Sequence, residues 1–238
     1  MAVGILIAKF IATKWVLFIM EIAFLVLQAP FLLLALFLSL YLILLTLAPF
    51  VIPAKKKPQP SRQRKFAIII PAHNEEKVIE GTLRSAFEIA YPRELFDVIV
   101  VADNCTDQTS KLALGAGAIV FQRSDPAKRG KGFALNWIIP QVLERLPAPG
   151  YDACVFVDAD SVISKDFLHE MNISLDEGHR IVQSSDLVLD NAGSWRVQLM
   201  LIAFALQNYV RPLGKAALGF SVPLKGNGMC FSVDVLRT

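Results

Sequence analysis

Two carboxylates two positions apart follow an apolar run in the middle of the sequence. Asp158 and Asp160 come directly after residues 153–157, whose side chains are typical of a buried strand. Residues two apart on an extended chain point to the same face, so both carboxylates can converge on one hard cation. Mg²⁺ or Mn²⁺ held by one or two carboxylates completes its shell with water and substrate phosphates. The pair therefore favours a metal and phosphate site, although a solvated turn also explains such a tripeptide.

Three further polar clusters stand where strands are expected to end. They are residues 71–76, 102–107 and 128–136. Open α/β sheets bind ligands outside the carboxyl ends of their strands, which is where these clusters would gather. Asp103 can accept a hydrogen bond from a ligand or cap the next helix, whereas Thr106 and Asp107 are better suited to capping. Lys131 stands between two glycines, where a close backbone approach and a positive charge suit a diphosphate.

Short apolar runs alternate with stretches of helical length and periodicity after residue 65. The expected strands are residues 66–71, 96–102, 118–122, 153–158 and 180–185. The expected helices are residues 75–90, 107–114, 131–146 and 165–177. Continuous apolar strands imply burial on both faces, so the fold class is α/β with a mostly parallel sheet. Residues 195–210 are also strongly apolar, and a place in the soluble core is the default interpretation, with a place on the membrane as the alternative.

The first 65 residues are expected to form a membrane anchor and a basic linker. Residues 22–54 carry no charge, and a bilayer crossing needs about 20 residues, so residues 1–53 contain at least one expected transmembrane helix. Residues 2–20 either lie in the membrane interface or form the first leg of a hairpin. Six cationic residues in the linker, residues 54–65, place it in the cytoplasm and favour anionic lipid head groups over nucleic acid.

Charge and cysteine content narrow the function of residues 66–238. This part carries 16 Lys and Arg against 20 Asp and Glu, a formal net charge of −4, which argues against nucleic-acid binding. The three cysteines are widely separated and form no Cys-x-x-Cys pair, so reduced thiols are expected. The glycine patterns of P-loop and Rossmann dinucleotide-binding proteins are both unmatched, which disfavours an NAD(P) protein.

The motifs, taken in order, resemble the family 2 glycosyltransferases, especially bacterial membrane-anchored ones related to synthases of cellulose, hyaluronan and poly-N-acetylglucosamine. The motifs read Pro-Ala-His-Asn-Glu, Val-Ala-Asp-Asn-Cys-Thr-Asp, Arg-Gly-Lys-Gly-Phe-Ala-Leu-Asn and Val-Asp-Ala-Asp, followed by Val-Gln and Lys-Gly-Asn-Gly-Met-Cys-Phe. The resemblance covers residues 66–238. It implies a GT-A fold whose Rossmann-like half binds a nucleotide sugar, with Mg²⁺ or Mn²⁺ bridging the diphosphate.

The resemblance also implies roles for individual residues. A pocket for the base and ribose would be lined by Pro71, Asn74 and Glu75. Asp103 would accept a hydrogen bond from the uracil ring, and Lys131 would lie near the diphosphate or the sugar. Asp158 would lie near the ribose and the metal, and Asp160 would be the principal metal ligand.

One motif of the family is missing from the sequence. Family members place a Thr/Ser-Glu-Asp motif after the Gly-Asn-Gly segment, and its Asp is the general base, so the resemblance implies an incomplete domain with the base expected beyond Thr238. The expected function is inverting transfer from a UDP-sugar to a glycan or lipid-linked acceptor at the cytoplasmic membrane face, in polysaccharide or glycoconjugate synthesis. The alternative is a membrane-anchored module that binds nucleotide sugar without catalysis.

Overall fold

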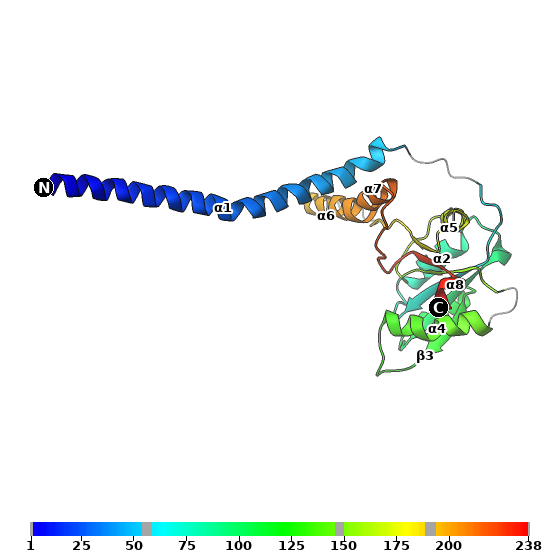
Figure 1. Cartoon of the computed structure of the whole chain (residues 1–238). Helices are drawn as coiled ribbons and strands as arrows, with labels where there is room; N and C mark the ends of the chain where they lie inside the picture. The colour runs from blue at the N-terminus through cyan, green and yellow to red at the C-terminus, as the bar shows by residue number, and fades with distance from the viewer. Residues whose placement is uncertain (1, 54–58, 146–149, 189–193, 238) are drawn as a thin grey trace. The chain divides into compact units, whose positions relative to one another are not determined.

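The protein consists of two compact units, shown along the chain in Figure 1. The computed structural model describes residues 2–53, 59–145, 150–188 and 194–237. Three of the linker lysines, Lys55, Lys56 and Lys57, lie outside the described residues. The first unit comprises Met1–Ala54 with Val210–Phe220, and the second comprises Lys55–Tyr209 with Ser221–Thr238.

The first unit contains one long apolar helix. The helix α1 runs without interruption through Ala2–Val51, so residues 2–20 continue the helix and do not form the first leg of a hairpin. Within it, Leu17–Val51 is long and apolar enough to cross a membrane by length and composition. At about 1.5 Å per residue such a stretch exceeds the roughly 30 Å hydrocarbon core of a bilayer.

A second helix of this unit packs closely on α1. The helix α7 (Arg211–Ala217) contacts α1 where Leu45 and Ala48 are 2% and 4% exposed. The two residues lie three apart and therefore share one face of α1. Gly214 is buried at this contact, and a Cβ there would lie 1.9 Å from the Leu45 carbonyl oxygen. The absence of a side chain at Gly214 lets the two backbones approach.

Gly214→Ala is expected to loosen α7 from α1 at a cost of about 1–3 kcal/mol, because the added methyl group overpacks the contact. Faster tryptic cleavage after Lys215, in the full chain in detergent, measures this opening. The matched control is Gly132→Ala in a helix of the second unit, where no described atom lies within 4 Å of the added Cβ. That change should be neutral or stabilising by up to about 1 kcal/mol. Equal cleavage rates in the two variants would contradict the packing argument.

The second unit is built on a six-stranded sheet of order β3-β2-β1-β4-β6-β5. Its strands are β1 (Phe66–Ala72), β2 (Phe96–Asp103), β3 (Ile119–Arg123), β4 (Ala153–Phe156), β5 (Ile181–Gln183) and β6 (Met229–Ser232). The first four are parallel, and β6 runs antiparallel to both β4 and β5. The predicted α/β class with a mostly parallel sheet is confirmed. The short strand β6 was not predicted as a strand.

Helices cover both faces of the sheet, as the continuous apolar strands predicted. One face packs against α2 (Ile79–Phe87), α3 (Thr109–Gly115) and α5 (Phe167–Asp176), and the other against α4 (Lys131–Arg145) and α8 (Val233–Leu236). A short 3₁₀ helix, Arg93–Leu95, leads into β2. Each face of the sheet has its own hydrophobic core. Alternate residues of β1 pack into these two cores, with Ile68 in the first and Ile69 in the second.

The apolar segment after residue 194 does not join either core. It forms α6 (Trp195–Ala205) and a π-helical turn (Leu206–Val210), and neither contains a buried residue. The default interpretation of residues 195–210 as a core helix is therefore wrong. Other helices form the cores on both faces of the sheet, and no residue of α6 belongs to either core.

The order of the strands creates a switch point between β1 and β4. From β1 the chain builds outward through β2 and β3, and it then returns to place β4 on the other side of β1. The loops that follow β1 and β4 therefore diverge, and a crevice between such loops is where open α/β sheets bind ligands.

Candidate active site

Hydrogen bonds tie together the loops that follow β1 and β2. Asn74 adopts a left-handed conformation with φ 58°, and its side-chain oxygen accepts a hydrogen bond from the Thr106 N–H at 2.8 Å. The Glu75 N–H donates to the Thr109 hydroxyl at 2.8 Å. The Asp107 carboxylate accepts from the Thr109 N–H, two residues on, at 3.0 Å, whereas the N-cap position of α3 is Gln108, whose side chain makes no capping hydrogen bond. Two polar loops thus form one wall at the carboxyl ends of the strands.

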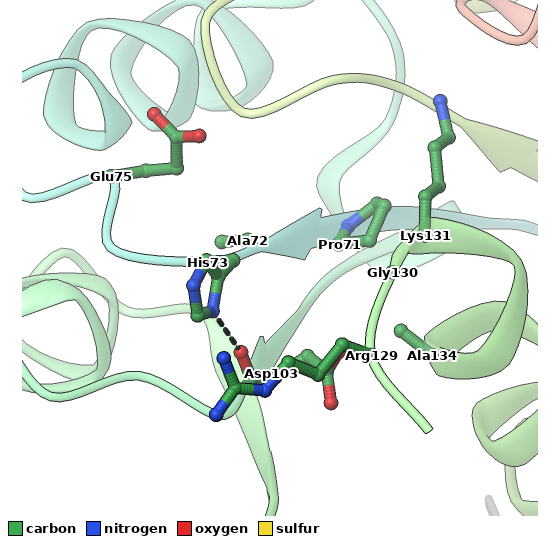
Figure 2. Close-up of a pocket in the computed structure, with 9 residues that line it drawn as sticks. All are labelled: Pro71, Ala72, His73, Glu75, Asp103, Arg129, Gly130, Lys131 and Ala134. Atoms are coloured by element: carbon green, nitrogen blue, oxygen red, sulfur yellow. Dashed lines mark hydrogen bonds between the residues drawn. The ribbon is translucent and has the colours of Figure 1, made fainter. Parts of the chain in front are cut away.

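A cavity of about 390 Å³ opens beside this wall (Figure 2). Its lining residues are Pro71, Ala72, His73, Glu75, Asp103, Arg129, Gly130, Lys131 and Ala134. The structure thus brings together four of the residues predicted for nucleotide-sugar binding. Asn74 is not among the lining residues, because its side chain is directed to Thr106. His73 and Arg129 were not predicted, although both stand inside the polar clusters read from the sequence.

The protonation of His73 follows from its contact with the backbone. Its Nδ1 lies 2.7 Å from the Asp103 carbonyl oxygen (Figure 2). A carbonyl oxygen only accepts hydrogen bonds, so Nδ1 carries the proton and donates. In the neutral ring Nε2 is then an acceptor for a ligand N–H or O–H.

Asp103 is held in place by a buried ion pair. Its Oδ1 accepts hydrogen bonds from Arg123 at 2.5 Å and from the Asn104 amide at 2.9 Å, and both charged side chains are only 6% exposed. Asp103 and Arg123 are register partners on β2 and β3. Among the described residues no hydrogen bond reaches Oδ2, which leaves this atom for a ligand. Arg123 was missed in the sequence because only the strand register places it opposite Asp103.

The two carboxylates after β4 lie on a turn. The strand ends at Phe156, and the Ser161 N–H donates to the Asp158 carbonyl at 3.3 Å. The predicted strand to residue 158 and the extended geometry through Ala159 are therefore wrong, since the chain turns back there. Even so, Asp158 and Asp160 line the same cavity of about 750 Å³. The Asp160 side chain is exposed, and within the described part of the chain no protein group pairs with its carboxylate.

Three contacts from distant parts of the chain hold this turn. The Thr82 hydroxyl of α2 donates to the buried Ala159 carbonyl at 2.6 Å. The Asn227 side chain accepts from the Asp158 N–H and donates to the Ser161 hydroxyl, both at 3.0 Å. These contacts hold the turn without involving the Asp158 or the Asp160 carboxylate.

Lys131 connects the two cavities. Its ammonium group donates to the Asp158 carboxylate and to the Gly226 carbonyl. Lys131 lines the first cavity and Asp158 lines the second, so their ion pair joins the linings of the two cavities. A positive charge and two carboxylates at this position suit a ligand that carries both a diphosphate and a divalent cation.

The loop Lys225 to Gly228 links the turn to β5 and the π-helix. The Gln183 side chain accepts from the Lys225 N–H at 2.8 Å and donates to the Asn227 carbonyl at 2.7 Å. The Lys225 ammonium donates to the Asn208 side chain at 2.8 Å. Burial lowers the pKa of Lys225, and the charge of Asp186 acts in the opposite direction. The Val-Gln motif, which contains Gln183, and the Lys-Gly-Asn-Gly motif, which begins at Lys225, were both noted in the sequence. In the structure the two motifs bind each other, and Asn227 of the second holds the Asp158 backbone.

The carboxylates of Asp158 and Asp160 are oxygen ligands of the kind that suits a hard divalent cation. Among the described residues no group of three or more His, Cys, Asp or Glu could enclose a metal ion. Two carboxylates alone match the way Mg²⁺ is bound together with substrate phosphates, and they do not match a closed zinc site. The three cysteines are free thiols.

Fold and site together define an α/β protein with two polar cavities and a pair of carboxylates after β4, next to the switch point of its sheet. Residues 63–238 match the family described as Glycosyltransferase like family 2, and the chain belongs to this family. The fold is accordingly GT-A.

Several proteins of known name are similar to this chain. The beta-monoglucosyldiacylglycerol synthase of Nostoc sp. is 28% identical over 168 residues, covering 68% of this chain and 34% of that protein. The poly(ribitol-phosphate) beta-N-acetylglucosaminyltransferase TarS of Staphylococcus aureus is 31% identical over 123 residues, covering 48% and 19%. The matched segments thus span about a fifth to a third of these relatives.

A solved structure has the same fold. The mannosyltransferase PcManGT from Pyrobaculum calidifontis, in complex with GDP-Man and Mn²⁺, superposes with a TM-score of 0.57 at 20% identity. The superposition covers 82% of this chain and 56% of that one.

Proposed function

We propose that the protein is an inverting glycosyltransferase that moves a sugar from a UDP-sugar to a glycan or lipid-linked acceptor at the cytoplasmic face of a membrane. Polysaccharide or glycoconjugate synthesis is the proposed setting. The observation that carries the proposal is the turn with Asp158 and Asp160 beside Lys131, at the switch point of a GT-A sheet. The names of TarS and the Nostoc synthase describe sugar transfer to a polymer and to a lipid, which supports both acceptor classes.

The uracil and ribose would occupy the smaller cavity. Asp103 lines this cavity together with Pro71 and Glu75, and its free carboxylate oxygen Oδ2 would suit the uracil N3–H. Nε2 of His73 supplies a second acceptor. Asn74 would act indirectly by holding the loop that carries Glu75.

The diphosphate would lie between the cavities, near Lys131. The Lys131 ammonium, held by the Gly226 carbonyl, would neutralise phosphate charge. Asp158 and Asp160 would hold Mg²⁺ or Mn²⁺, with Asp160 as the principal ligand. The cation supplies electrostatic stabilisation of the charge that develops on the leaving diphosphate. Asn227 would keep the Asp158 backbone in position for this role.

The acceptor would enter through the larger cavity. Its wall combines hydroxyl groups of Ser184 and Ser185 with the apolar side chains of Leu187 and Val188. An acceptor hydroxyl placed there would approach the sugar from the side of Asp158 and Asp160. We assign the general base to none of the described residues.

The membrane attachment is part of the same proposal. The apolar stretch Leu17–Val51 would anchor the protein. The basic linker, residues 54–65, would contact anionic head groups on the cytoplasmic side, as the distribution of positive charge near a span favours. Nucleic acid is not a proposed partner.

The test is a panel of UDP-sugars with Mn²⁺ or Mg²⁺, using the full chain in detergent, with UDP-binding calorimetry on the same sample. Metal-dependent release or transfer of sugar would support the proposal. Tight, metal-dependent UDP binding without turnover would support a module that binds nucleotide sugar without catalysis. Failure to bind UDP with either metal would contradict both functions.

Gly228→Ala is expected to reduce sugar release or transfer by about 10²-fold, the scale that a misplacement of about 1 Å produces. Gly228 has φ 64°, and a Cβ there would lie 1.8 Å from the Ser184 hydroxyl and 3.1 Å from the Ser184 Cβ, so the Ser184 side chain or the loop that carries Asn227 must shift. The matched control is Gly178→Ala, which has φ 91° but no described atom within 4 Å of the Cβ. Gly178→Ala should lower only the free energy of unfolding, by about 1–2 kcal/mol, and should not lower turnover. Equal turnover in both variants would show that the loop does not position the site.

A further inference from the structure

The helix α6 has an apolar face that no described part of the protein covers. Trp195, Leu199, Met200 and Ile202 are 65%, 56%, 61% and 57% exposed, and no residue of α6 is buried. Trp195, Leu199 and Ile202 are four and three positions apart, so they form one stripe along the helix. A contiguous stripe of large apolar side chains marks an interaction surface, unlike single exposed residues.

The charged residues of the sequence that contains this stripe have one sign. Residues 191–233 contain no Asp or Glu, and their charged residues are Arg196, Arg211, Lys215 and Lys225. The Arg196 guanidinium lies 5.5 Å from the centre of the Trp195 ring, at the start of the stripe. Apolar side chains combined with exclusively cationic ones are complementary to an anionic bilayer surface.

A short connection in the chain joins α6 to a helix of the other unit. In the other unit, α7 packs on α1 through the close contact of Gly214 with Leu45. Only Leu206–Val210 separates α6 from α7, and six residue steps reach at most about 22 Å. Leu45 belongs to the stretch that is long and apolar enough to cross a membrane. The covalent connection therefore limits the distance between the end of α6 and the start of α7, the helix that packs on the apolar helix proposed to cross the bilayer.

We propose that α6 lies on the surface of an anionic lipid bilayer, with its Trp195, Leu199 and Ile202 stripe inserted at the boundary of head groups and acyl chains. Phe204, also on α6, lines the larger cavity, so this arrangement places the mouth of that cavity beside lipid. The bilayer contact requires no sugar transfer and is testable separately from the proposed activity.

The test uses the full chain in lipid nanodiscs that contain phosphatidylglycerol with brominated acyl chains. Trp15→Phe/Trp137→Phe leaves Trp195 as the sole tryptophan, and bromine quenches a tryptophan that reaches the acyl chains. The expected result is a loss of about half of the Trp195 emission relative to unbrominated nanodiscs, since interfacial helices bury their apolar face by about 5–10 Å. The variant that keeps only Trp137, on α4 at a separate place in the second unit (Figure 1), should retain its emission.

The second part of the test introduces negative charges into the apolar stripe. In the Trp195-only protein, Leu199→Glu/Ile202→Glu should remove most of the quenching without changing the thermal midpoint, because both positions are exposed. The matched control is Leu114→Glu on α3, where the leucine is 66% exposed, and quenching should persist. Equal Trp195 emission in brominated and unbrominated nanodiscs would overturn the proposal. A blue shift of Trp195 that depends on protein concentration, without bromine quenching, would assign the stripe to a second copy and overturn it as well.

Discussion

Asp160→Asn is expected to lower metal-dependent sugar transfer by about 10³-fold, the upper range for removal of one electrostatic group from an active site. The Asp160 carboxylate is exposed on the turn after β4 and has no protein partner among the described residues. Its negative charge therefore contributes to no contact that the fold needs. An amide of the same shape removes the charge that a divalent cation requires and leaves the turn intact, since the turn is held by Thr82 and Asn227.

Two measurements on the full chain in detergent check this result. Turnover of the UDP-sugar and UDP-binding calorimetry, each with and without Mn²⁺, should show that Asp160→Asn loses both the activity and the effect of metal on binding. The control is Glu144→Gln, which neutralises an exposed carboxylate on α4 away from both cavities. It should behave as the unaltered protein. An Asp160→Asn protein with full metal-dependent transfer would remove Asp160 from the site.

Arg123→Met is expected to lower the free energy of unfolding by about 3–5 kcal/mol, because it leaves a buried carboxylate without its counter-ion. Arg123 and Asp103 are both 6% exposed and lie 2.5 Å apart. The same arginine also binds Asp125 and the Lys128 carbonyl, so its loss frees the loop before α4. Urea denaturation in detergent measures the change.

The control for Arg123→Met is an ion pair of the same length at the surface. Arg180 lies 2.5 Å from Asp234, but the two side chains are 59% and 60% exposed. Arg180→Met should cost at most about 1 kcal/mol. Arg123→Met/Asp103→Asn should cost less than the sum of its single variants, because the second change removes the unpaired charge. A loss for Arg123→Met no larger than that for Arg180→Met would contradict the buried ion pair.

Several residues that follow the strands and line the smaller cavity were predicted from the sequence. Pro71, Glu75, Asp103 and Lys131 were predicted from motif and position, and they line one cavity. This was possible because parallel strands place their carboxyl ends at one edge of the sheet. Asn74 was predicted to line the same pocket, but it is not among the residues that line this cavity, and its side chain binds Thr106 in the neighbouring loop. A motif identifies a residue near a ligand, but it does not tell whether the side chain faces the ligand or the loop behind it.

The sequence by itself determined the α/β class, the strand ends that carry the polar residues, and the apolar stretch that is long enough to cross a membrane. Each of these follows from local properties, namely runs of apolar residues and the period of side chains along helices and strands. Only the tertiary structure decided the pairing of Asp103 with Arg123, the bracing of Asp158 by Asn227, and the exposure of α6. These features depend on strand register and on contacts between residues as far as 69 positions apart. No local pattern records such contacts, because they form only when the sheet places distant segments side by side.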